Sequence, residues 1–223
     1  MSQSPYQVSK MKNQQSGFTL VEIAIVLVII GLLLGGVLKG QELINSAKVK
    51  SLANDFRSIP TFVYGYQDRF RSLPGDDRDP TRVGGTLATT PGLVGNNVIE
   101  GAWDSETTTD ETFLFWQHVR LAGLAVGPTS FSGTVTPAQF VPRNSEGGRI
   151  GVQGTAPMAG WNGSFFACSG NISGRFALQL DTMMDDGNAA TGTVRAFSAW
   201  AGTTGTNAPA PVDGTLYTVC IGY

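Results

Sequence analysis

The sequence has few of the residues that build metal and catalytic centres. It contains two cysteines, Cys168 and Cys220, and one histidine, His118. Zinc sites need three or four nitrogen, sulfur or carboxylate ligands held together, and nucleophilic sites need a base beside the nucleophile. No G-x-S-x-G nucleophile motif is present. We therefore predict that the chain is not an enzyme, and we interpret His118 as a structural residue.

Charge is also scarce. The 223 residues carry 15 Lys and Arg against 17 Asp and Glu, which gives a net charge of −2 and a charged fraction of 14%. Proteins that bind nucleic acid through their backbone phosphates carry a basic patch or stripe. The sequence has no dense stripe of that kind, so we expect no nucleic-acid partner.

What the sequence does have is one long apolar run, residues 18–38, in which Glu22 is the only ionisable residue. As a helix it would be about 31 Å long, which matches a hydrocarbon core of about 30 Å. A buried core helix is the alternative, but such helices are shorter and have a polar face. The run therefore predicts a membrane-spanning helix.

The residues before this run do not form an ordinary secretory signal. Sixteen mostly polar residues, including Lys10 and Lys12, end at Ser16 and Gly17, and the apolar run starts directly afterwards. A secretory signal instead places its small-residue cleavage site after the apolar stretch. No cysteine lies near the run, which also excludes a lipoprotein signal.

The order Gly17-Phe18-Thr19-Leu20-Val21-Glu22 resembles the processing site of type IV pilins and type II secretion pseudopilins. In that family a prepilin peptidase removes the leader after the glycine and methylates the new N-terminus. The resemblance implies cleavage between Gly17 and Phe18, N-methylation of Phe18, and an assembly role for Glu22. It covers about the first 55 residues.

The resemblance also implies where the chain acts and with what. It places the protein in the bacterial inner membrane as a single-pass protein whose C-terminal domain is extracytoplasmic. Its partners would be the lipid bilayer, prepilin peptidase, other subunits and an inner-membrane assembly platform. Lysine and arginine counts on the two sides of the run do not favour this orientation, because Lys39, Lys48, Lys50 and Arg57 follow it.

The two cysteines support an extracytoplasmic domain. A single pair in a domain rich in Gly and Thr fits an oxidising compartment, so we predict a disulfide between Cys168 and Cys220. The alternative is a pair of reduced thiols buried in a cytoplasmic domain.

Beyond the apolar run, residues 39–73 continue with one apolar face. Its members are spaced by three and four residues: Val49, Leu52, Phe56, Ile59, Val63, Tyr66, Phe70 and Leu73. Such a stripe fits either a helix packed on a sheet or a coiled coil. Pro60 disfavours a long regular coil, and Pro74-Gly75 should end the helix.

Residues 74–223 are predicted to form a globular domain of short strands and loops. The order Thr108-x-x-Glu111 fits a capping box that opens a helix ending near Ala122. Residues 176–184 are ambiguous, and we favour a helix. The predicted strands are residues 148–152, 164–167, 193–200 and 215–221.

Two acidic clusters have the oxygen ligands that calcium takes: residues 76–79, and residues 185–188 with Asp185 and Asp186. Some pseudopilins bind calcium in a C-terminal loop. Neither cluster has the spacing of an EF-hand, and the alternative is a turn with solvated charges. We expect no other cofactor.

Together these features predict an α+β fold with four parts: a cleaved leader (1–17), a membrane-spanning half-helix (18–38), an amphipathic half-helix (39–73) and an extracytoplasmic domain (74–223). The predicted function is a major or minor filament subunit of a type IV pilus or secretion pseudopilus. The alternative is a membrane-tethered binding protein or adhesin that uses its acidic loops or its tryptophans, Trp103, Trp116, Trp161 and Trp200.

Overall fold

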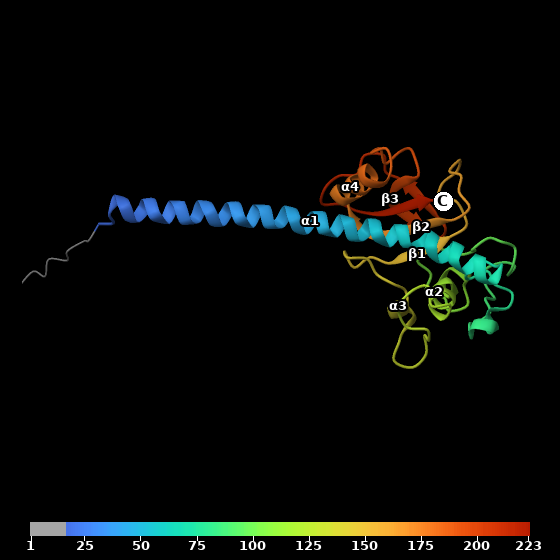
Figure 1. Cartoon of the computed structure of the whole chain (residues 1–223). Coiled ribbons are helices and arrows are strands. Elements are labelled where there is room, and N and C mark those ends of the chain that lie inside the picture. The colour runs from blue at the N-terminus through green and yellow to red at the C-terminus, as the bar shows by residue number, and fades with distance from the viewer. Residues whose placement is uncertain (1–16) are drawn as a thin grey trace, which may run out of the picture. The chain divides into compact units, whose positions relative to one another are not determined.

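The computed structural model describes residues 17–223, which form an α+β fold (Figure 1). Residues 1–16, the greater part of the predicted leader, lie outside the described residues. The elements are α1 (Leu20–Phe70), η1 (Pro80–Val83), α2 (Glu111–Leu121), α3 (Pro137–Phe140), β1 (Ile150–Gln153), β2 (Phe166–Ser173), α4 (Gly174–Met184), β3 (Val194–Ala201), β4 (Thr204–Asn207) and β5 (Leu216–Gly222).

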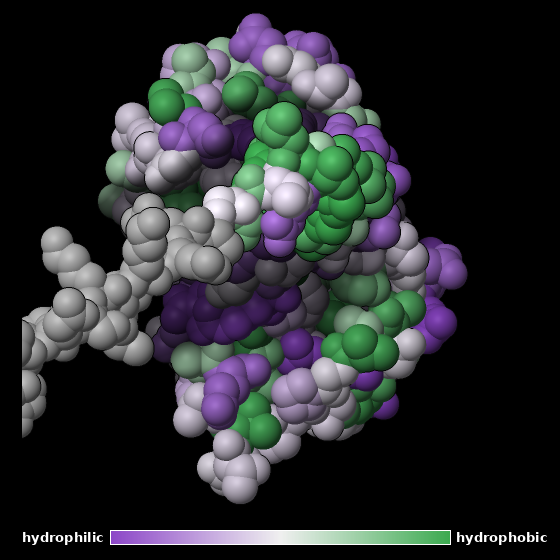
Figure 2. All heavy atoms as spheres, turned by 90° about the vertical axis from the view of Figure 1, so that its left-hand side faces the viewer, coloured by the Kyte–Doolittle hydropathy of each residue, from purple (hydrophilic) through white to green (hydrophobic). Residues whose placement is uncertain are grey.

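The chain divides into two compact units, Met1–Asn45 and Ser46–Tyr223. The first unit contains the N-terminal part of α1, whose apolar side chains lie on the surface. Figure 2 shows them in green. Their exposed fractions range from 46% at Ile23 to 92% at Leu20. This part of α1 is long and apolar enough to span a membrane.

The second unit begins with the C-terminal part of α1, where the predicted apolar stripe is buried. Six of its eight members are at most 2% exposed: Val49, Leu52, Phe56, Ile59, Val63 and Tyr66. The helix continues through Pro60. It ends at Phe70 and not at Leu73, because Arg71 adopts a left-handed conformation with φ of 57°. Leu73 still packs against the core.

The sheet has five antiparallel strands in the order β1-β2-β5-β3-β4. Side chains alternate between its two faces, as strand geometry requires. Ala167, Val219 and Ile221 contribute to the main core, which also holds the buried stripe of α1. The predicted packing of this helix against an antiparallel sheet is confirmed, and the coiled-coil alternative is wrong for residues 49–66.

The opposite face of the sheet carries a smaller core around the disulfide. Cys168 and Cys220 face each other across β2 and β5 and are bonded, as predicted. They pack with Trp103, Trp161, Phe166 and Phe197. Three of the four tryptophans are at most 6% exposed, so only Trp200 remains partly accessible for the surface role considered above.

Most predicted elements are present. The short helices η1 and α3 were not predicted individually, and the strands and α2 differ from the prediction as follows. The strand β4 has the sequence Thr-Gly-Thr-Asn, which is polar and contains Gly, so its pattern did not predict a strand. β2 extends to Ser173, well beyond the predicted end at residue 167. The capping box at Thr108 is wrong, because α2 begins at Glu111 with Asp110 as its N-cap. The ambiguous residues 176–184 lie in α4, as favoured.

A buried polar network joins α1, α2 and the segment between them. The Tyr66 hydroxyl donates to Asp77 Oδ2 at 2.7 Å, and Arg82 donates to both Asp77 oxygens.

His118 on α2 is held at both ring nitrogens. Its Nδ1 accepts the Gly75 N–H, and its Nε2 lies 2.8 Å from the carbonyl oxygen of Thr86. Burial lowers the pKa of His118, so the neutral ring fits this arrangement. His118 is therefore a structural residue.

Candidate functional site

The first candidate site is the start of α1. Gly17 and Phe18 precede the helix and are exposed, and the Phe18 side chain is 79% exposed. Glu22 is the third residue of α1 and is exposed as well. The structure thus places an accessible Gly-Phe peptide bond less than two helical turns before a carboxylate on an apolar helix.

The backbone at this helix start has a side-chain partner. The Thr19 hydroxyl accepts the N–H of Glu22 at 3.2 Å, which satisfies one of the free donors of the first turn. Glu22 also lies near the positive end of the helix dipole. Sequence reasoning did not identify Thr19 as a cap, although the spacing Thr19-x-x-Glu22 is that of a capping box.

Residues 12–38 match the family model described as the prokaryotic N-terminal methylation motif. The chain carries a prepilin-type motif. This motif is the signature of type IV pilins and pseudopilins, and it implies processing by prepilin peptidase and assembly with other subunits. The match covers Gly17, Phe18 and Glu22. No curated protein and no solved structure matches the chain.

The prepilin-type motif and the apolar helix together fit a membrane-anchored, pilin-like precursor. Pilin-type proteins are structural subunits. The matched residues lie outside the globular unit, Ser46–Tyr223.

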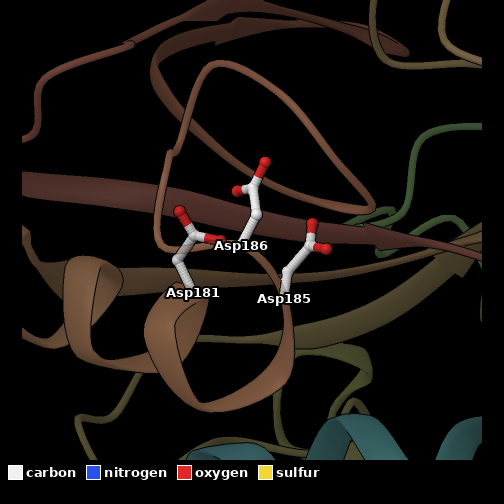
Figure 3. Close-up of side chains that lie close together, drawn as sticks. All are labelled: Asp181, Asp185 and Asp186. Carbon is white, nitrogen blue, oxygen red and sulfur yellow. The ribbon is translucent and has the colours of Figure 1, made fainter.

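The second candidate site is acidic and lies at the C-terminal end of α4. Asp181, Asp185 and Asp186 each offer one carboxylate oxygen, and these oxygens all lie within 4.8 Å of one another. Figure 3 shows the three side chains side by side, with Asp181 on the helix and the other two directly after it. Two ligands of one calcium ion, each about 2.4 Å from it, are at most about 4.8 Å apart.

Asp181 is the unusual member of this cluster. Its side chain is fully buried, and neither carboxylate oxygen has a hydrogen-bond partner. Burial, and then the charges of Asp186 and Asp185, raise its pKa to about 6. A buried carboxylate without a donor is costly, so a bound cation or a proton would stabilise this side chain.

The other two aspartates are held by the loop that follows them. Asp185 accepts the backbone N–H groups of Thr193 and Val194. Asp186 accepts from the backbone of Asn188 at 2.9 Å and from the Thr191 hydroxyl at 2.7 Å. Sequence reasoning named Asp185 and Asp186 but missed Asp181, although its spacing of four residues from Asp185 on a predicted helix was a usable signal.

The earlier acidic cluster, residues 76–79, does not form a comparable site. Asp77 is paired with Arg82, and Asp76 accepts backbone N–H groups of residues 95–97. Both side chains are at most 2% exposed. The alternative interpretation, a turn with solvated charges, is wrong for Asp76 and Asp77, because both side chains are buried and bonded within the fold.

Proposed function

We propose that the chain is the precursor of a structural subunit of a type IV pilus-like filament, either a pilin or a pseudopilin. The observation that carries this proposal is the prepilin-type motif at residues 12–38, placed at the start of an exposed apolar helix. Prepilin peptidase would cut after Gly17 and methylate Phe18. The apolar part of α1 would hold the subunit in the inner membrane, with Ser46–Tyr223 outside the cytoplasm.

Within the filament, apolar helices of neighbouring subunits would pack on one another. The apolar side chains of the N-terminal part of α1 are largely exposed, and packing on a neighbouring subunit would remove them from water or lipid. The negative charge of Glu22 would pair with the methylated amino group of Phe18 on a neighbour. That pairing would also neutralise a carboxylate that is costly in lipid.

The processing step gives the first test. Membrane-extracted protein should begin at Phe18 and carry one N-methyl group, as determined by intact-mass measurement and N-terminal sequencing. Gly17→Leu should leave the leader attached, because the peptidase needs a small residue before the cut. The matched control is Gly35→Leu, which lies on the same exposed segment with no neighbouring atoms and should be cut normally. A mature wild-type N-terminus at Met1, or beyond Leu38, would contradict the proposal.

We propose, as a second function, that Asp181, Asp185 and Asp186 bind a calcium ion. The supporting observation is the fully buried Asp181, whose two oxygens lack partners while it faces two further carboxylates. Calcium takes oxygen ligands and adapts to irregular geometries. Bound there, it would join the end of α4 to the loop that leads into β3.

Calcium should therefore stabilise the full-length protein in detergent. At a concentration 100 times the dissociation constant, the gain in unfolding free energy is about 2.7 kcal/mol, which raises the Tm by several degrees. Asp181→Asn should abolish this response, because it removes the buried charge. Asp68→Asn, an exposed aspartate on α1, should keep it. An equal Tm with calcium and with a chelator would show that this cluster is not a calcium site.

A further inference from the structure

Pro60 leaves a gap in the hydrogen bonds of α1. The helix continues through this residue, but proline has no N–H group. In a regular α-helix the N–H of residue 60 would donate to the carbonyl of residue 56. The Phe56 carbonyl therefore lacks its usual donor. Phe56 is 0% exposed, so water does not replace that donor, and an unpaired carbonyl there would be costly.

A side chain from the other end of the globular unit supplies the missing donor. The hydroxyl of Tyr223 donates to the Phe56 carbonyl oxygen at 2.9 Å. The two residues are 167 positions apart, and Tyr223 directly follows β5, at the place marked C in Figure 1. The sheet thus bonds to α1 at the point where Pro60 removes the bond of the helix itself.

Three contacts hold Tyr223 in position for this bond. Its N–H donates to the Phe165 carbonyl at 3.0 Å, and its own carbonyl accepts the Ser164 N–H. Its ring stacks on Phe165, with 5.1 Å between the ring centroids and 23° between the planes. Phe165 is buried in the main core. Because the backbone and the ring are already fixed, the hydroxyl loses little conformational freedom when it bonds.

The Tyr223 hydroxyl remains a donor at neutral pH. Burial, and then the neighbouring Tyr64, raise the pKa of Tyr223 to about 12, although Arg57 opposes this shift. Only the protonated hydroxyl can donate to a carbonyl. The bond to Phe56 is therefore available well above neutral pH.

We propose that Tyr223 is a strap that closes the gap at Pro60, so that α1 opens at this proline only when the strap is released. With the bond made, the buried Phe56 carbonyl has a donor, and the turn around Pro60 is tied to the sheet. With the bond broken, that carbonyl is unpaired and the turn opens more often. A proline inside a helix is a weak point, and here the weak point is also where the sheet is attached.

A double-mutant cycle on the full-length protein in detergent tests the strap by urea denaturation. Tyr223→Phe removes the hydroxyl and keeps the ring that stacks on Phe165. It should raise the equilibrium constant for unfolding about tenfold, because a buried carbonyl loses its donor. Pro60→Ala restores an N–H that can donate to the Phe56 carbonyl. In that background Tyr223→Phe should change the constant at most about twofold.

Hydrogen exchange measured by mass spectrometry locates the effect. In Tyr223→Phe the exchange of residues 57–64 should become about tenfold faster than in the wild type. Adding Pro60→Ala should bring it back towards the wild-type rate. The matched control is Tyr64→Phe, which removes an exposed hydroxyl from the same helix and should leave the exchange unchanged.

Equal effects of Tyr223→Phe in the two backgrounds would overturn the proposal, because the hydroxyl would then act independently of the missing N–H. So would unchanged stability and exchange in Tyr223→Phe alone. If Pro60→Ala does not fold, Pro60→Ser supplies the same N–H and takes its place in the cycle. Should neither variant fold, exchange in Tyr223→Phe decides: faster exchange of residues 57–64 supports the strap, and an unchanged rate refutes it.

Discussion

Filaments should be absent from cells whose only copy of this protein carries Glu22→Ala. The variant should still be cut after Gly17, stay in the membrane and fold normally, because Glu22 lies on the exposed part of α1 and outside the globular unit. A carboxylate within a membrane helix costs about 2.5 kcal/mol or more near the centre. Pairing with the Phe18 amino group of a neighbour would offset that cost, and the alanine variant would leave this amino group unpaired.

Two further variants separate pairing from helix capping. The Thr19 cap is worth about 1 kcal/mol, so Thr19→Val should reduce filament number at most modestly if pairing governs assembly. Glu22→Gln keeps the shape but removes the charge, and it should fail as Glu22→Ala does. Glu42→Ala, which removes an exposed carboxylate farther along α1, should assemble normally. Electron microscopy of sheared filaments and immunoblotting of membranes would measure these outcomes, and wild-type assembly of Glu22→Ala would refute the pairing role.

Removing the disulfide should cause the largest loss of stability. The bond closes a loop with a sequence separation of 52 residues, for which the chain-entropy model gives about 4 kcal/mol. Cys168→Ala combined with Cys220→Ala should lower the unfolding free energy of the detergent-solubilised protein by about that amount, as measured by urea denaturation. Both side chains are fully buried, so lost packing adds to the effect.

The same protein provides the control for this experiment. A reductant strong enough to open the bond should lower the urea midpoint of the wild type towards that of the double variant, and should leave the variant unchanged. Equal midpoints for the wild type with and without reductant would contradict a stabilising role. Free thiols in native protein, mapped without reductant, would contradict the bond itself and the oxidising compartment that it implies.

The fold was predictable where local pattern and burial agree. The stripe from Val49 to Tyr66 has helical spacing and is buried on one side, so its period alone predicts the packed face. β4 was not predictable, because Thr204–Asn207 is an edge strand stabilised by pairing with β3 and has no apolar alternation. The N-cap of α2 is Asp110 and not the predicted Thr108, because an isolated β-bridge between Thr90 and Asp110 fixes where the helix starts.

The candidate sites were likewise predictable only where their residues are close together in the sequence. Gly17, Phe18 and Glu22 are neighbours in the sequence, so their motif is visible without a structure. Asp181 was missed because its importance lies in its complete burial and its unpartnered oxygens, which depend on how α4 packs. Glu111 was interpreted as an ordinary capping residue, since nothing in the sequence indicates that its side chain is buried with one oxygen unpartnered.

The position of the disulfide also affects how the protein would respond to a protease. Residues 169–219 lie between the two bonded cysteines, and they include α4, β3, β4 and the acidic loop. A single cut between the end of β2 and the start of β5 leaves both fragments joined through the bond, with β2 and β5 still paired. A subunit nicked in its acidic loop would therefore remain one covalent molecule, attached to its membrane helix, until the disulfide is reduced.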